Sequence, residues 1–260
     1  MKPNMLKKCF LENRIAHGTF CSLKDPAVIE MIGITGYDFV ILEMEHTSMN
    51  LSEVQDLIRA AEVVGITPIV RVPQDASGSY LRVAELGAPA VLVPHVRTAK
   101  MAQELVNAIK YPPIGDRGMS AATRANDYGV LSMKEHMEKS NQEIMAMIMI
   151  EDLEAVDNLE EILSVPGLDL VFVGPADLSR SCGVPSEMKH PKVRKVIEHI
   201  FETAKKYPHI KIGIPSFQIE DIPDTINLGA NLITCPPSDV RVLFSSLKQS
   251  LEDIKATYQK

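Results

Sequence analysis

The sequence of 260 residues lacks tryptophan, has only four cysteines and contains no long apolar run. No hydrophobic stretch approaches the roughly 20 residues that a membrane-spanning helix needs. Residues 1–20 include several lysines but no apolar core of a secretory signal, so none is expected. The cysteines show neither a CxxC pair nor metal-like spacing, and together with 13 methionines they indicate a reducing, cytoplasmic setting.

An excess of basic charge is also missing. The formal net charge is −7, and the sequence has no basic stripe of the kind that contacts a phosphate backbone. Without tryptophan there is little aromatic surface on which bases stack. We therefore expect neither a nucleic-acid nor a membrane partner. Hydrophobic residues at 45% and charged residues at 23% are typical of a globular protein.

What the sequence does contain is a regular alternation of short β-branched runs with longer amphipathic stretches. The expected strands are 17–23, 38–45, 66–72, 90–94, 144–151, 169–174, 211–215 and 231–235. The expected helices are 25–35, 51–64, 77–86, 98–110, 153–163, 193–206 and 239–257. Repeated strands and helices in a chain of about 250 residues predict a (β/α)₈ barrel or a doubly wound sheet.

A missing glycine motif favours the barrel. The first expected strand leads into Ser22-Leu23-Lys24-Asp25-Pro26, where no glycine lets a pyrophosphate approach the backbone. No linker or shift in composition interrupts the chain. We therefore predict an α/β fold, a single-domain (β/α)₈ TIM barrel spanning residues 1–260. The non-periodic segment 111–128 is the exception, and loops of this length inside compact domains tend to be functional.

Two of the expected helices have readable boundaries. Asp25 before Pro26 predicts an N-cap followed by proline at the first helical position. Asn50 stands three residues before Glu53, which predicts a capping box, and Gly65 ends that helix.

Two acids at neighbouring strand ends are the sharpest candidates for chemistry. In barrel enzymes the reacting groups come from the carboxyl ends of the strands, and Glu151 and Asp177 follow the fifth and sixth expected strands. Two carboxylates without histidine or cysteine at ligand spacing suit a hard cation such as Mg²⁺ or Mn²⁺. The alternative is that both residues simply cap the helices that follow.

An arginine and two histidines are expected at the same end of the barrel. Arg71 ends an apolar strand, where a guanidinium can grip a carboxylate and stabilise an enolate, or form a structural ion pair. His46 follows Glu45 and is a candidate general base, with a capping or interior histidine as the alternative. His95 follows a proline, and we assign it no role.

Two further absences narrow the reaction. No expected strand ends in lysine, which a Schiff-base aldolase needs inside the barrel. The turns after the last two strands contain Pro215, Pro236 and Pro237, which lack the N–H groups that would bind a phosphate. An unphosphorylated substrate handled by a metal is the consistent interpretation.

Several ordered motifs carry a resemblance to a known family. They are Glu45-His46, Arg71-Val72-Pro73, Tyr111-Pro112-Pro113, Arg117-Gly118, Ile150-Glu151 and the run from Gly174 to Ser179. With these motifs, and over about residues 17–239, the chain resembles the HpcH/HpaI aldolases. These are metal-dependent pyruvate aldolases that include 2,4-dihydroxyhept-2-ene-1,7-dioate aldolase and the 2-keto-3-deoxy sugar-acid aldolases.

The resemblance implies that Glu151 and Asp177 bind a divalent metal (Mg²⁺ or Mn²⁺, with Co²⁺ as a further candidate) that chelates pyruvate. The implied catalytic and substrate-binding residues are Glu43, His46, Arg71, Gly174 and Ala176. The resemblance also implies a homohexamer with helices exchanged between subunits. The final helix and the segment 111–128 are then candidate interface elements, with Arg124 as a candidate to approach a neighbouring site.

Three positions depart from the family pattern. Glu43 stands where the family has Asp, Met149 where it has Gln, and Ala84-Glu85 where it has Leu-Asp. Because proton transfer is sensitive to shifts of about 1 Å, these changes leave the aldehyde specificity and the rate open. The expected reaction converts a 4-hydroxy-2-keto acid to pyruvate and an aldehyde. The alternatives are an oxaloacetate decarboxylase, a citrate-lyase-like lyase, and a barrel that binds a keto acid without turnover.

Overall fold

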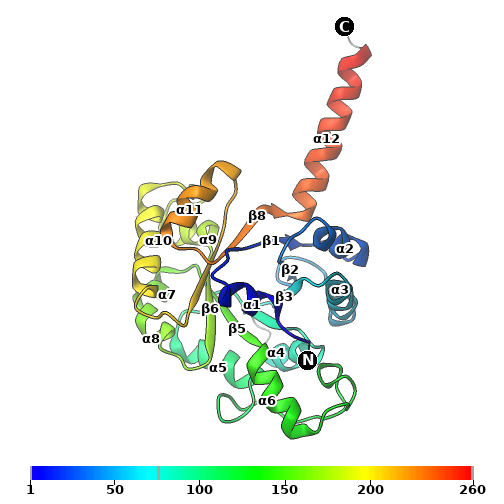
Figure 1. Cartoon of the computed structure of the whole chain (residues 1–260). Helices are drawn as coiled ribbons and strands as arrows, with labels where there is room; N and C mark the ends of the chain where they lie inside the picture. Colours follow the sequence, from blue (N-terminus) through cyan, green and yellow to red (C-terminus); the bar gives the residue numbers. More distant parts are fainter. Residues whose placement is uncertain (1, 75–76, 259–260) are drawn as a thin grey trace.

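The computed structural model describes residues 2–74 and 77–258, and its strands form one closed parallel barrel (Figure 1). Each strand pairs with the next in the sequence, and the last pairs with the first. The strands are β1 Ala16–Cys21, β2 Phe39–Glu43, β3 Thr67–Arg71, β4 Ala90–Val93, β5 Met145–Ile150, β6 Leu168–Val173, β7 Lys211–Pro215 and β8 Leu232–Ser238. The predicted (β/α)₈ TIM barrel is confirmed.

The helices surround this barrel, apart from the first, which covers one end, and the last, which extends away from it (Figure 1). They are α1 Met5–Leu11, α2 Pro26–Ile34, α3 Leu51–Val64, α4 Ser77–Glu85, α5 Ala99–Ile109, α6 Met133–Glu143, α7 Leu153–Asp157, α8 Leu159–Leu163, α9 Pro175–Ser181, α10 Pro191–Ala204, α11 Ile222–Leu228 and α12 Asp239–Tyr258. The prediction of a single helix over residues 153–163 is wrong. The segment forms the two short helices α7 and α8, which are separated by Asn158, and the side-chain amide of Asn158 donates to the carbonyl oxygen of Arg97.

The predicted helix boundaries agree with the structure. The Asp25 side chain accepts from the N–H of Ala27, and Pro26 opens α2. Asn50 and Glu53 form the capping box of α3, and Gly65 ends that helix at a φ of 78°. These contacts satisfy backbone groups that helix ends otherwise leave unpaired.

The strands have apolar residues on both faces because each face meets a different core. Phe39, Ile41 and Ile69 belong to a cluster that fills the barrel, whereas Val40 and Leu42 belong to the layer between the strands and the helices. The side chains of α1 that join the interior cluster are Leu6, Cys9 and Phe10. This short helix therefore closes the amino-terminal end of the barrel, which leaves the opposite end to form a pocket.

The segment 111–128 is irregular apart from the 3₁₀ turn η1 Arg124–Asn126, yet it is firmly anchored. Arg117 is 2% exposed and donates to Glu85 at 3.0 Å (Nε) and 2.5 Å (Nη2). Arg124 pairs with Glu62 of the same chain at 2.6 Å. We call the buried group beneath this segment the loop cluster; its members are Glu85, Tyr111, Arg117, His136 and Ser140. The departure at Glu85 thus belongs to a structural ion pair.

The last helix, α12, points away from the barrel (Figure 1). Its large apolar side chains are exposed: Val240, Val242, Leu243, Phe244, Leu247, Leu251, Ile254 and Tyr258. Within residues 2–74 and 77–258, no helix is long and apolar enough to cross a membrane.

Candidate active site

A pocket of about 330 Å³ lies at the carboxyl ends of the strands and contains every residue that the sequence nominated for the site. Its ionisable lining residues, which we call the charged wall, are Glu43, His46, Arg71, Glu151 and Asp177. Its aromatic and proline lining residues, which include Phe20, Phe172, Pro215, Phe217 and Pro237, are called the apolar wall. Gly174, Ala176 and Met149 also border the cavity, and none of the described residues that line it is a lysine.

Strand periodicity explains why these charges converge. Alternate residues of a strand point to the same side, so Glu43 continues the inward series of Phe39 and Ile41. Met147 and Met149 face the interior, and Glu151 follows in the same phase. In the β2–β3 register Glu43 lies directly opposite Arg71.

Arg71 is held on several sides. Its Nε donates to Glu43 Oε2 at 2.6 Å, and its Nη2 also contacts that carboxylate. Its Nη1 lies 3.5 Å from Glu45 Oε2 and 3.7 Å from the sulfur of Met149. The guanidinium carbon lies 4.9 Å from the centre of the Phe20 ring. The structural ion pair is therefore present, and the same guanidinium borders the pocket.

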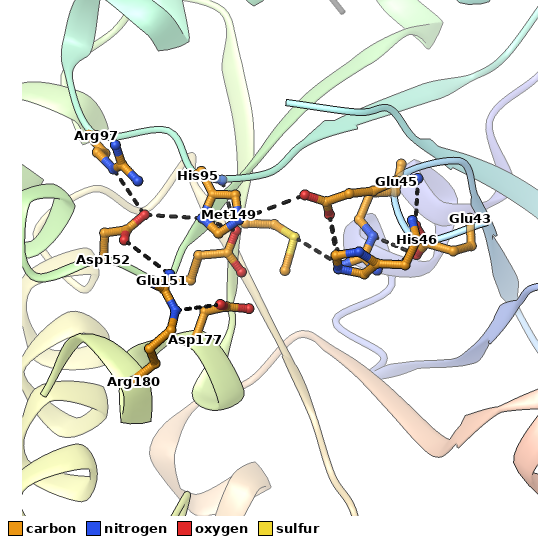
Figure 2. Close-up of polar contacts among 11 residues, drawn as sticks. Glu43, Glu45, His46, His95, Arg97, Met149, Glu151, Asp152, Asp177 and Arg180 are labelled. Carbon is orange, nitrogen blue, oxygen red and sulfur yellow. Dashed lines mark hydrogen bonds and ion pairs between the residues drawn. The ribbon is translucent and has the colours of Figure 1, made fainter. Parts of the chain in front are cut away.

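Glu43 supports the turn that carries His46. Its Oε1 accepts the backbone N–H groups of Glu45 at 2.7 Å and His46 at 3.0 Å. Among the described residues, the Glu43 carboxylate therefore contacts Arg71 and the backbone of residues 45 and 46, and it forms no hydrogen bond or ion pair with the His46 imidazole (Figure 2). The His46 side chain is 66% exposed, and its Nε2 lies 3.7 Å from Glu45 Oε2.

Glu151 is buried at the base of the charged wall. Its Oε1 accepts the backbone N–H of His95 at 2.8 Å. A Cβ on residue 174 would lie 2.4 Å from Glu151 Oε2, so only glycine leaves room for this carboxylate. Burial raises the pKa of Glu151 to about 7, and the charges of Asp177 and Glu45 add to this rise while His95 opposes it.

Asp177 comes from the first turn of α9 and lies beside Glu151 (Figure 2). Arg180 Nε lies 3.2 Å from its Oδ1. A divalent cation fits this pair, because hard cations prefer carboxylate oxygens and because a cation relieves the electrostatic cost of burying Glu151. In the part of the chain that the structure describes, no cluster of three or more His, Cys, Asp or Glu forms a complete metal site, so water and substrate oxygens would complete the coordination.

His95, to which the sequence assigned no role, lies among the carboxylates of the site. Its Nδ1 lies 3.1 Å from Asp152 Oδ2 and 3.3 Å from Glu151 Oε1, and its Nε2 lies 3.7 Å from Glu45 Oε1 (Figure 2). The backbone of His95 has a φ of 52°, a conformation that turns the chain at the end of β4. Its place at a strand end was the signal, shared with the residues that were nominated.

The contacts of Glu45 and Asp152 with this group were not predicted either. Burial raises the pKa of Glu45, and the charge of Arg71 opposes this rise. Asp152 accepts from Arg97 at 3.1 Å and so fixes the far side of the His95 ring (Figure 2). Both residues stand next to a nominated residue in the sequence, which is the only sign of their involvement.

Comparisons with known proteins show the family of the chain. The family model HpcH/HpaI aldolase/citrate lyase matches residues 16–235. The 5-keto-4-deoxy-D-glucarate aldolase of Citrobacter koseri is 34% identical over 251 residues, which are 96% of each chain. The corresponding aldolase of Klebsiella pneumoniae is 34% identical over 79% of each chain.

Two solved structures show the same fold over the whole chain. The HpcH/HpaI aldolase from Desulfitobacterium hafniense superposes with a TM-score of 0.91 at 28% identity and covers 97% of each chain. The citrate synthase SbnG superposes with a TM-score of 0.89 at 32% identity, covering 98% of this chain and 99% of that one. The chain belongs to the HpcH/HpaI aldolase/citrate lyase family, whose members are generally divalent-metal-dependent, and it is a carbon–carbon lyase of the aldolase type.

Proposed function

We propose that the chain is a divalent-metal-dependent pyruvate aldolase that cleaves or forms 4-hydroxy-2-keto acids, with pyruvate and an aldehyde as the other side of the reaction. The observation that carries the proposal is the pairing of buried Glu151 with Asp177 in a pocket that also holds the Arg71 guanidinium. The curated relatives, which are 5-keto-4-deoxy-D-glucarate aldolases, support the same reaction type.

Glu151 and Asp177 would hold Mg²⁺ or Mn²⁺, with Co²⁺ as a further candidate. When bound, the metal supplies Lewis-acid polarisation of the keto group and stabilises the charge of the enolate. Arg71 binds the carboxylate of the keto acid with the N–H groups that Glu43 leaves available. The backbone from Gly174 to Ala176, beside Glu151, lines the same subsite.

His46 moves the proton. In the cleavage direction its imidazole removes the proton from the C4 hydroxyl, directly or through one water, as the C3–C4 bond breaks and the aldehyde leaves. The imidazolium then returns that proton to C3 of the enolate, which gives pyruvate. Glu45, 3.7 Å from His46 Nε2, stabilises the charged ring, and Glu43 fixes the backbone that carries it.

The test is pyruvate release from a panel of 4-hydroxy-2-keto acids and oxaloacetate, measured on protein stripped with EDTA and then given Mg²⁺, Mn²⁺ or Co²⁺. We expect release from the hydroxy-keto acids only when a metal is restored. Release from oxaloacetate alone would identify a decarboxylase. No release from any substrate, with metal bound, would contradict an enolate-forming enzyme and favour a barrel that only binds keto acids.

We also propose that α12 packs against a second copy of the chain, in the homohexamer implied by the family. Its exposed apolar residues, which include Val240, Leu243, Leu247, Leu251 and Ile254, recur at helical spacing and so form one face. In proteins most of the stability of a helix comes from tertiary packing of its apolar face, so an uncovered apolar face favours a partner. Light scattering on the wild type and on Leu247→Glu tests this; a wild-type monomer, or a variant with an unchanged mass, would contradict it.

The four cysteines are free in the structure, which supports our placing the enzyme in the reducing cytoplasm.

A further inference from the structure

Asp152 follows Glu151 in the chain and stands at the N-cap position of α7. An aspartate at this position ordinarily accepts a hydrogen bond from a backbone N–H in the first turn of the helix. Among the described residues, the Asp152 side chain makes no such capping hydrogen bond, and the N–H of Leu153 donates to the hydroxyl of Ser181 at 2.9 Å. The Asp152 side chain is only 10% exposed, so this carboxylate must find its partners elsewhere in the chain.

The two oxygens of Asp152 face three nitrogen-bearing side chains (Figure 2). Oδ2 lies 3.1 Å from Nε of Arg97 and 3.1 Å from Nδ1 of His95. Oδ1 lies 3.7 Å from Nη2 of Arg180. None of these four residues is among the described residues that line the pocket, so any effect of Asp152 on the pocket passes through its neighbours.

His95 connects Asp152 to Glu151. The backbone N–H of His95 donates to Glu151 Oε1 at 2.8 Å, and its Nδ1 lies 3.3 Å from the same oxygen. The φ of 52° at residue 95 costs free energy for a residue other than glycine, and such a conformation persists only where surrounding contacts hold it. The contact between the His95 ring and Asp152 is a restraint of this kind. Asp152 thereby holds in place both nitrogens that face Glu151.

Arg180 connects the same carboxylate to Asp177. Its Nε lies 3.2 Å from Asp177 Oδ1, and its Nη2 faces Asp152 (Figure 2). Asp177 and Arg180 are three residues apart on α9, a spacing that places two side chains on the same face of a helix. The Arg180 side chain is 57% exposed, so this connection is weaker than the one through His95. One buried carboxylate is thus linked to both candidate metal ligands.

We propose that Asp152 is a positioning residue that holds Glu151, and to a lesser degree Asp177, in place for the divalent metal. The proposal rests on the aldolase function above, which assigns these two residues as ligands. Two carboxylates at a metal-free site repel each other, so their positions depend on contacts with the groups behind them. Such groups orient metal ligands, and their substitution typically lowers metal affinity by about 10- to 100-fold. Because Asp152 acts before the metal binds, a saturating metal concentration compensates for its loss.

Calorimetric titration of metal-free protein with Mn²⁺ tests the proposal without turnover. Asp152→Asn keeps the shape of the side chain but loses its charge, and we expect the Kd for Mn²⁺ to rise at least about tenfold. At saturating Mn²⁺, kcat for pyruvate release should stay within about threefold of the wild-type value. The matched control is Glu154→Gln, which removes an exposed carboxylate 4.0 Å from Nε of Arg97 and should change the Kd less than about twofold. An unchanged Kd in Asp152→Asn, an equal rise in Glu154→Gln, or a kcat that saturating metal does not restore would overturn the proposal.

His95→Asn tests the connection itself. Asparagine tolerates a positive φ, so this variant keeps the backbone N–H that faces Glu151 and loses the ring. We expect weaker Mn²⁺ binding, and a loss in the Asp152→Asn/His95→Asn double variant that is smaller than the product of the two single losses. Independent losses would contradict the connection. A wild type that binds no Mn²⁺, or a Glu151→Gln variant that binds it normally, would refute the metal site and this proposal with it. If both behave as expected and Asp152→Asn binds like the wild type, only the role of Asp152 is refuted.

Discussion

Two clusters of charged residues in this barrel have similar contacts but differ in what surrounds their arginine. The first, which we call the pocket cluster, comprises Glu43, Glu45, Arg71 and Glu151. The second is the loop cluster around Arg117. In each, an arginine grips a glutamate and lies over an aromatic ring, Phe20 at 4.9 Å in one and Tyr111 at 4.6 Å in the other.

The difference lies in what surrounds the arginine. The remaining contacts of Arg117 go to the carbonyl oxygen of Ile109 at 3.3 Å and to Ser140 at 3.1 Å, so its guanidinium is enclosed by the chain. Arg71 borders a cavity, and the carboxylates around it outnumber it. Because buried charge is costly unless it is paired, a balanced cluster is consistent with a structural role, and an unbalanced one is poised to bind an ion or a substrate.

The largest effect is expected from a substitution that removes charge from the pocket cluster. Glu151→Gln keeps the shape of the side chain but loses the anionic oxygen, so we expect kcat/KM to fall about a thousandfold and metal affinity to fall with it. Calorimetric titration with Mn²⁺ and single-substrate kinetics measure the two effects. Unchanged metal affinity would show that Glu151 is not a ligand.

Substitutions in the loop cluster should change the free energy of unfolding. Arg117→Met leaves the partly buried Glu85 carboxylate without its cation, and we expect a loss of about 2–4 kcal/mol in the free energy of unfolding measured with urea. The double variant Glu85→Leu/Arg117→Met removes both charges and should recover part of that loss. Equal stabilities of the single and double variants would contradict the ion-pair explanation.

The two clusters should also respond to pH in opposite directions. Burial raises the pKa of Glu151 to about 7, so the folded protein holds a proton that the unfolded chain releases, and stability falls as the pH rises from about 4.5 to 7. Burial, with the charge of Arg117, lowers the pKa of His136 to about 4, so stability falls as the pH drops from about 6.5 to 4. Each effect amounts to about 3 kcal/mol at most.

Urea unfolding of metal-free protein between pH 4 and 8 measures both changes in the free energy of unfolding. Glu151→Gln should abolish the fall in stability at high pH. His136→Phe should abolish the fall in stability at low pH, because it removes the titrating ring. Among the described residues neither ring nitrogen of His136 has a hydrogen-bond partner, so an apolar ring loses no hydrogen bond there. A variant that abolished the opposite change would show that the assignment is wrong.

The barrel and the converging charges were predictable because both depend on local periodicity. Continuous apolar runs marked the strands, and the two-residue repeat carried Glu43, Arg71 and Glu151 to the same interior. The partner of Glu43 was less predictable. Its contact with the backbone of the following turn depends on how residues 44–46 bend, which no repeat encodes.

The features that were missed depend on distant or very local structure. His95 enters the site because its positive φ turns the chain at the end of β4, and nothing in Pro94-His95 announces that conformation. The seven-residue helices α1, α9 and α11 offer too few turns for a periodic pattern. Glu85 was linked to aldehyde specificity by its place in a motif, whereas its ion pair with Arg117 joins segments 32 residues apart.

The smallest effect is expected when the same substitution, arginine to lysine, is made at Arg71 and at Arg117. Arg71→Lys keeps a positive charge at the pocket but loses the fork that grips Glu43 and the face that lies over Phe20. We expect kcat/KM to fall about tenfold, with a small change in unfolding free energy because a cation remains beside Glu43. Arg117→Lys is the matched control: it should lower stability by more than Arg71→Lys does and leave kcat/KM unaffected, because its guanidinium contacts only the chain. If Arg117→Lys lowered activity and Arg71→Lys lowered stability, the distinction between a binding cluster and a structural one would be reversed.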